Sequence, residues 1–103
     1  MNEVRLEFVR HLNFRIGGKL REGKLVIHRI KRMEGDSECW ACHWFLTDFS
    51  PEDAKTYGDD PLDALLNCVR FISSLIDTEK KRGNAIWWKQ EDDRAGLECL
   101  LPL

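Results

Sequence analysis

Four cysteines and three histidines are the residues of this chain with the most specific possible chemistry. Cys39-Trp40-Ala41-Cys42-His43 matches the Cys-x-x-Cys-His pattern of covalent haem attachment. That chemistry uses a helical turn, where thiols three residues apart share a side. Here the pattern lies within a predicted strand, where residues three apart point to opposite faces. A zinc site would also need a second pair of ligands. We therefore predict no cofactor and no metal, and interpret the cysteines as small buried hydrophobes.

Carboxylates form the second group that could act together. Residues 34–63 contain nine Asp and Glu but only one basic residue, Lys55, whereas residues 1–33 contain nine Lys and Arg and three Glu. These acids could simply offset the basic strands, or could catalyse acid–base chemistry if an apolar cleft shifted their pKa values. The first of these is the simpler interpretation, because adjacent strands often pair opposite charges. Our functional hypothesis is a third, an acidic surface that steers a basic protein partner. The residues expected to contact such a partner are Asp48, Glu52, Asp53, Asp59, Asp60 and Trp88.

One long helix over residues 60–82 is predicted to organise the fold. Asp60 is suited to cap the first amides, Pro61 fits the first helical position, and Gly83 can take the closing left-handed conformation. Its apolar arc covers about 220°, whereas roughly 100° suffices for packing on one sheet. The main arc consists of Leu62, Leu65, Leu66, Val69, Ile72 and Ile76. We expect residues 48–58 or the C-terminal tail to cover the second stripe. The alternative is a homodimer through that stripe, which consists of Ala64, Cys68, Phe71 and Leu75.

Alternating and β-branched segments predict a sheet that covers this helix. The segments are residues 3–16, as one bent strand or two, then 25–33, 38–49 with Trp40, Cys42, Trp44 and Leu46 on one face, and 85–89. Turns are expected at 17–18, 22–23 and 34–37, and one or two turns of helix that begin at residues 50–53 and end at Gly58. The predicted fold is α+β, an antiparallel meander of four to five strands packed on one long helix. It forms a single domain over residues 1–103.

Overall composition narrows the class of partner. The net charge of −2 gives no reason to expect nucleic acid. No apolar run approaches the ~18 residues of a membrane span, and the first residues do not form a basic and then apolar leader. We therefore expect a cytoplasmic protein with no membrane partner, in which the cysteines are thiols.

The run Tyr57-Gly58-Asp59-Asp60-Pro61-Leu62-Asp63-Ala64-Leu65 resembles the Y-G-x-D-x-[LI]-x-A-L helix start of an uncharacterised family of small bacterial α+β proteins. Asp63 stands where those proteins usually have glutamine. The resemblance implies no established activity. Such proteins look like the small single-domain proteins encoded beside bacterial toxins, which act by binding. We therefore expect a non-enzymatic protein-binding module of the immunity type, which occludes a basic toxin domain. A homodimeric structural module and a small enzyme that uses the acidic cluster remain the alternatives.

Overall fold

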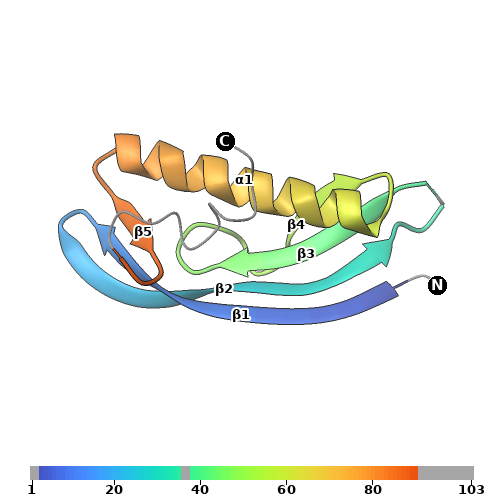
Figure 1. The fold of residues 1–103 in the computed structure, drawn as a ribbon, viewed down its shortest axis with the longest axis horizontal. Helices are drawn as coiled ribbons and strands as arrows, with labels where there is room; N and C mark the ends of the chain where they lie inside the picture. Colours follow the sequence, from blue (N-terminus) through green and yellow to red (C-terminus); the bar gives the residue numbers. More distant parts are fainter. Residues whose placement is uncertain (1–2, 36–37, 91–103) are drawn as a thin grey trace.

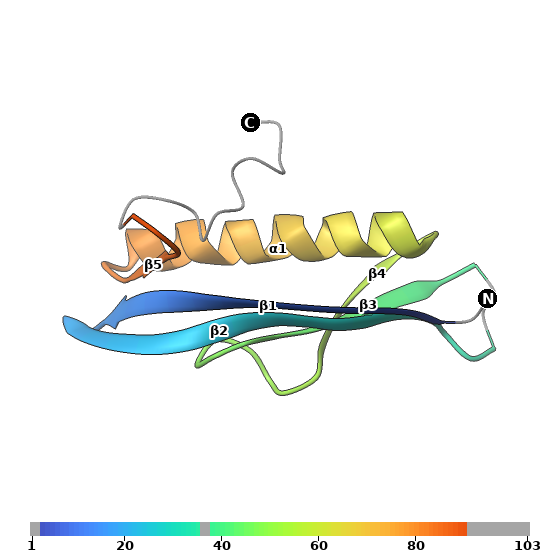
Figure 2. The same ribbon diagram turned by 60° about the horizontal axis from the view of Figure 1, so that its bottom comes forward.

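A five-stranded antiparallel sheet packs against one long helix in the computed structural model, which describes residues 3–35 and 38–90 (Figure 1). The strand order is β4-β3-β2-β1-β5. The helix forms a second layer on one face of the sheet (Figure 2). This arrangement confirms the predicted α+β class. The elements are β1 (Glu3–Ile16), β2 (Lys19–Arg32), β3 (Trp40–Leu46), β4 (Ala54–Gly58), α1 (Pro61–Lys81) and β5 (Ala85–Trp87).

The first two strands form one long hairpin. Gly17 and Gly18 make its turn with φ values of 57° and 79°, which favour glycine. The turn expected at residues 22–23 is wrong, because Gly23 lies within β2, opposite Leu12. A Cβ atom at Gly23 would collide with the ring of Phe14 and would lie 2.7 Å from Thr47 Cβ. This glycine therefore permits close packing within a strand.

The segment after β3 differs most from the sequence-based expectation. Residues 50–53 form no helical turn, because the Ser50 hydroxyl accepts a hydrogen bond from the Leu46 amide at 2.8 Å. Residues 54–58 then form β4, which pairs antiparallel with β3 from Trp44↔Ala54 to Trp40↔Gly58. Pairing with the edge of β3 supplies the backbone hydrogen bonds that a helical turn would have made. β3 itself ends at Leu46, three residues earlier than predicted.

The core lies between the sheet and α1. The predicted face of β3, consisting of Trp40, Cys42, Trp44 and Leu46, is buried there, which confirms the alternation. On the helix, Ala64, Cys68 and Ile72 are fully buried, whereas Leu62 is 64% exposed. The buried face therefore includes two small residues, Ala64 and Cys68, together with Val69, Ile72 and Ile76 of the predicted main arc. The expectation that Leu62 belongs to this buried arc is wrong.

The helix begins and ends as its local signals predict. Asp60 Oδ1 accepts a hydrogen bond from the Asp63 amide at 2.7 Å, and the Asp63 carboxylate accepts one from the Asp59 amide at 2.9 Å. Gly83 has a φ of 87° immediately after the last residues. Local sequence therefore determines both ends of α1.

Two expectations fall at least partly outside the described residues. The turn predicted at 34–37 includes residues 36–37, and the tail predicted to cover the helix lies in residues 91–103. Gly35 takes the left-handed conformation at the start of that turn, with a φ of 79°. Within the described ranges, no helix has the length and apolarity that a membrane crossing needs.

Candidate protein-binding groove

Two adjoining open hollows lie between α1 and the segment that leads from β3 into β4. Their volumes are about 470 and 430 Å³, and both are lined by Phe49, Phe71 and Leu75. Asp48 lines one of them and Asp53 the other. We name this feature the loop groove: an apolar floor of Phe49, Phe71 and Leu75 with Asp48 and Asp53 at its rim.

Aromatic contacts fix the floor of the loop groove. The ring of Phe49 stacks on that of Phe14 from β1, with centroids 5.7 Å apart. Phe71 contacts the ring of Trp44 from β3 at 5.6 Å, yet it remains 52% exposed. Because Phe14 and Trp44 are buried in the core, they hold both groove rings in place.

A short turn after β3 positions Asp48. The amides of Phe49 and Ser50 both bond the Leu46 carbonyl at 3.1 Å. Asp48 has a φ of 66°, a left-handed conformation that Asp tolerates better than most residues. Its carboxylate pairs with Arg21 of β2 at 3.3 Å, and both side chains are partly exposed. The turn therefore holds one carboxylate at the rim while leaving it accessible.

Asp53 is held by a buried histidine. His43, on the face of the sheet opposite the helix, is 7% exposed, and its Nδ1–H donates to Asp53 Oδ1 at 2.8 Å. This hydrogen bond, with the nearby charges of Lys55 and Arg29, holds the pKa of Asp53 below its usual value. The Asp53 side chain is 53% exposed. Asp53 is therefore ionised at neutral pH. It stabilises the fold through its hydrogen bond with His43 and also lies at the rim of the loop groove.

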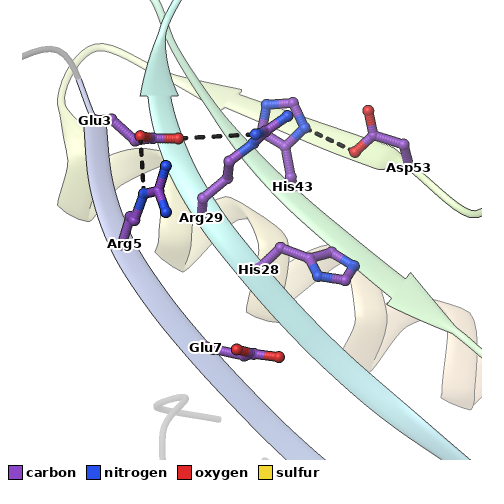
Figure 3. Close-up of a pocket in the computed structure, with 7 residues that line it drawn as sticks. All are labelled: Glu3, Arg5, Glu7, His28, Arg29, His43 and Asp53. Carbon is purple, nitrogen blue, oxygen red and sulfur yellow. Dashed lines mark hydrogen bonds and ion pairs between the residues drawn. The ribbon is translucent and has the colours of Figure 1, made fainter.

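The same histidine belongs to a polar hollow on the outer face of the sheet, of about 510 Å³ (Figure 3). Glu3 there pairs with Arg5 at 3.2 Å and with Arg29 at 3.8 Å. An aspartate that orients a histidine is one part of a catalytic base, but none of the described residues that line this hollow is a serine, threonine or cysteine. Among the described residues, no group of three or more His, Cys, Asp or Glu could hold a metal ion. We therefore infer that the hydrogen bond between His43 and Asp53 is structural and connects β3 to the segment before β4.

The predicted acidic cluster is divided into two groups. Asp48, Glu52 and Asp53 precede β4, whereas Asp59 and Asp60 follow it. At about 3.3 Å per strand residue, Asp53 and Asp59 are roughly 20 Å apart. These acids therefore do not form one cluster, because a strand that was not predicted lies between them.

Trp88 lies beside one edge of the sheet. It follows β5, one edge of the sheet, whereas β4 is the other edge. The guanidinium of Arg10 lies 3.9 Å from its ring centroid, and the Lys89 ammonium lies 4.3 Å away. Trp88 is half-buried against the core. Trp88 and Asp53 therefore lie beside opposite edge strands of the sheet.

The surface suggested for a homodimer is also divided. Ala64 and Cys68 are fully buried against the sheet and cannot contact another chain, whereas Phe71 and Leu75 line the loop groove. A hydrogen bond with Cys42 and burial raise the pKa of Cys68, so this thiol stays protonated. Cys42 and Cys68 are therefore part of the core. The remaining residues of the stripe, Phe71 and Leu75, line the loop groove.

The sequence indicates Phe71 and Leu75 as part of the second helix stripe, but it does not indicate Phe49 as part of the groove floor. The predicted strand 38–49 ends at Phe49, whereas in the structure Phe49 follows the turn that closes β3. Glu79, which also lines the groove, is buried and accepts hydrogen bonds from Arg82 at 3.1 Å and Asn84 at 2.9 Å. In the sequence, the signal that Glu79 has a special role is that it is an acidic residue directly before the basic residues at the end of the helix.

Comparison with protein families matches residues 10–99 to a family described as "Domain of unknown function (DUF6968)". Neither the curated proteins nor the solved structures contain a match to this chain.

Proposed function

Because the chain belongs to the family DUF6968, whose function is unknown, we propose from its geometry that it is a non-enzymatic protein-binding module. More specifically, we propose an inhibitor of the immunity type, which binds a basic bacterial toxin domain through the loop groove and occludes it.

The exposure of Phe71 carries this proposal. Its ring is fixed against Trp44 but is 52% exposed, so it presents apolar surface without a large loss of side-chain entropy on binding. Protein interfaces depend on such aromatic residues, surrounded by a polar rim. Here the rim contains the carboxylates of Asp48 and Asp53. We therefore infer that an apolar side chain of the partner contacts Phe71 while its basic residues face the rim.

Charge distribution supports a basic partner. Residues 34–63 carry nine acids and one lysine, and Glu52 lies exposed beside the groove between Pro51 and Asp53. Toxin surfaces that act on nucleic acid are basic, so an acidic rim would steer their association and favour them over acidic proteins. Inhibition would be steric, since a chain of this size placed over the toxin's active surface excludes its substrate.

The enzymatic alternative has weaker support. Asp60 caps α1, and its partner in the cap, Asp63, also bonds the Asp59 amide. The Asp53 carboxylate accepts a hydrogen bond from His43. These interactions give Asp53, Asp60 and Asp63 a role in folding, which weakens the case that they form a catalytic acid–base pair.

Growth rescue with a genetically neighbouring toxin tests the proposal. Cells that express the protein encoded beside this chain are grown with the wild-type chain, Phe71→Ala, Glu52→Lys or Leu62→Ala. Leu62 is the matched control, since it is an exposed apolar residue on the first turn of α1 and does not line the groove. We expect rescue by wild type and Leu62→Ala and its loss with the two groove variants, with a parallel decrease in affinity by calorimetry. Rescue that Phe71→Ala and Glu52→Lys leave unchanged would exclude the groove, and the absence of a toxic, basic partner would refute the immunity function.

A further inference from the structure

An apolar groove lies between α1 and the first two strands. It has a volume of about 430 Å³, and we name it the edge groove. Phe8 of β1 is 54% exposed there and Val9 48%, and on the helix Leu65 and Leu66 are half-buried. Large exposed hydrophobics gathered in one hollow are typical of an interaction surface. The residues that line the edge groove are Phe8, Val9, Arg10, Leu25, Ile27, Leu65, Leu66 and Val69.

The chain beyond β5 leads to this groove. β5 runs antiparallel to β1, so the chain after Trp87 continues alongside earlier residues of β1 (Figure 1). The side-chain amide of Asn13 donates a hydrogen bond to the Trp88 carbonyl at 3.3 Å, and the Arg10 guanidinium lies 3.9 Å from the Trp88 ring centroid. Arg10 is also one of the residues that line the edge groove. Trp88 therefore stands at one end of the groove.

The residues that follow Gln90 have the composition and the length to fill the groove. Residues 91–103 read EDDRAGLECLLPL, with three acids first and four leucines within residues 97–103. Fully extended, this segment spans about 43 Å at ~3.3 Å per residue, so it can reach along the whole groove from Trp88. An apolar segment beside an apolar groove gains stability when both leave water.

We propose that residues 97–103 of the same chain occupy the edge groove and cover Phe8 and Val9. Leucine side chains make this contact, so it does not need a regular ladder along β1, whose pairing with β2 shifts between Arg5 and Phe8. Pro102 has no amide hydrogen to donate to such a ladder. The volume of about 430 Å³ is within the range of ~300–1,000 Å³ that is typical of ligand pockets.

Tethering favours this occupant over a separate protein. Eight residues lie between Trp88, at the end of the groove, and Leu97, at the start of the apolar segment. A segment joined by a linker of this kind has an effective concentration on the order of millimolar at its site. A separate protein of the same chemistry at micromolar concentration would need roughly a thousandfold higher affinity to displace it.

The edge groove and the loop groove are separate surfaces. Among the described residues, they share no lining residue. The loop groove adjoins β4, whereas β1 lies towards the other edge of the sheet. The proposal therefore does not depend on the proposed function. It also differs from a cover over the second helix stripe, because Phe71 and Leu75 of that stripe line the loop groove.

Disulfide trapping through Cys99 tests the position of the segment in the full chain. All variants carry Cys39→Ser, which removes the half-buried thiol of Cys39. Cys42 and Cys68 are buried in the core and do not compete. Cys99 is then the one native thiol available to a cysteine that is introduced in the groove.

Two groove positions and one matched control supply the second thiol. Val9→Cys places it on the β1 side of the edge groove and Leu66→Cys on the α1 side. Phe71→Cys is the control, because Phe71 is 52% exposed, close to the 48% of Val9, but lines the loop groove. With oxidised glutathione, we expect Cys99 to form an intramolecular disulfide faster at the two groove positions than at Phe71→Cys. The expected ratio is roughly tenfold or more, because docking raises the local concentration of the Cys99 thiol there.

The leucines of the segment should carry the contact. Adding Leu100→Ser and Leu101→Ser to the Val9→Cys variant should lower its rate of disulfide formation to that of the Phe71→Cys control. Glu98→Gln, a polar substitution in the same segment, should leave the rate unchanged.

Three results would overturn the proposal. Equal rates at all three positions mean that the segment has no preferred site in the edge groove. Faster trapping at Phe71→Cys places the segment over the second helix stripe instead. A disulfide that links two copies at micromolar concentration, rather than closing within one, assigns the groove to a second copy. Circular dichroism of each reduced variant checks that the fold is retained, and Leu66→Cys decides the question on its own if Val9→Cys does not fold.

Discussion

Replacing Asp53 with alanine isolates the hydrogen bond that joins the β3–β4 segment to the sheet. The substitution leaves the Nδ1–H of His43 without its acceptor, in a side chain that is only 8% exposed. An unsatisfied buried donor costs about 1–3 kcal/mol. Because the Asp53 side chain is 53% exposed, water can partly replace it, so we expect a loss near the low end, about 1 kcal/mol. In a domain of this size, that loss lowers the melting temperature by roughly 4–8 °C.

Urea unfolding followed by tryptophan fluorescence measures this loss, since Trp44 lies in the core. Glu52→Ala is the matched control, because it removes a neighbouring exposed carboxylate, and we expect a change within about 0.5 kcal/mol. Equal stability of Asp53→Ala and the control would refute the assignment of the His43–Asp53 bond to the fold.

The pH dependence of the same variant provides a second check. The pKa of Asp53 is lowered by its hydrogen bond with His43, below the value of ~3.9 that it has in the unfolded chain. A lowered pKa means that Asp53 stabilises the folded state fully above the unfolded value. The part of the stability difference that comes from ionisation of the Asp53 carboxyl should therefore be present in full at about pH 5. It should then decrease as the pH falls below ~3.9 through the folded pKa, and a difference that stays constant to pH 2.5 would contradict the ionised pairing.

Three further predictions concern the helix and the core. Gly58→Ala should destabilise the fold by several kcal/mol in thermal unfolding, since the added Cβ would collide with the backbone of Ala64; an unchanged melting temperature would contradict this close approach. Val69→Asp should unfold the domain by circular dichroism, because Val69 is 6% exposed and an unpaired carboxylate there costs a large part of the ~5–15 kcal/mol available. In thiol labelling mapped by mass spectrometry, half-buried Cys39 should react in the native protein, and buried Cys68 only after denaturation; rapid native labelling of Cys68 would refute its place in the core.

Features that depend on neighbouring residues were predictable from the sequence. Asp60 and Gly83 mark the ends of α1, because a capping carboxylate and a left-handed glycine act within one turn of the helix. The buried face of β3 follows from its alternation, since strand geometry allows only two faces. The match of Tyr57 to Leu65 with a family pattern also gains a physical reason, because Gly58 permits β4 to approach the helix start.

Features that depend on which segments meet were decided by the tertiary structure. Residues 50–58 carry helix-start signals, but the free edge of β3 offers hydrogen bonds to a whole strand, and β4 forms there instead. This strand separates Asp53 from Asp59, which a linear charge count cannot show. The helix has an apolar surface wider than one sheet can cover, so its pattern alone does not select the buried stripe. Close packing on the sheet selects the small residues Ala64 and Cys68, and thereby leaves Phe71 exposed in the loop groove.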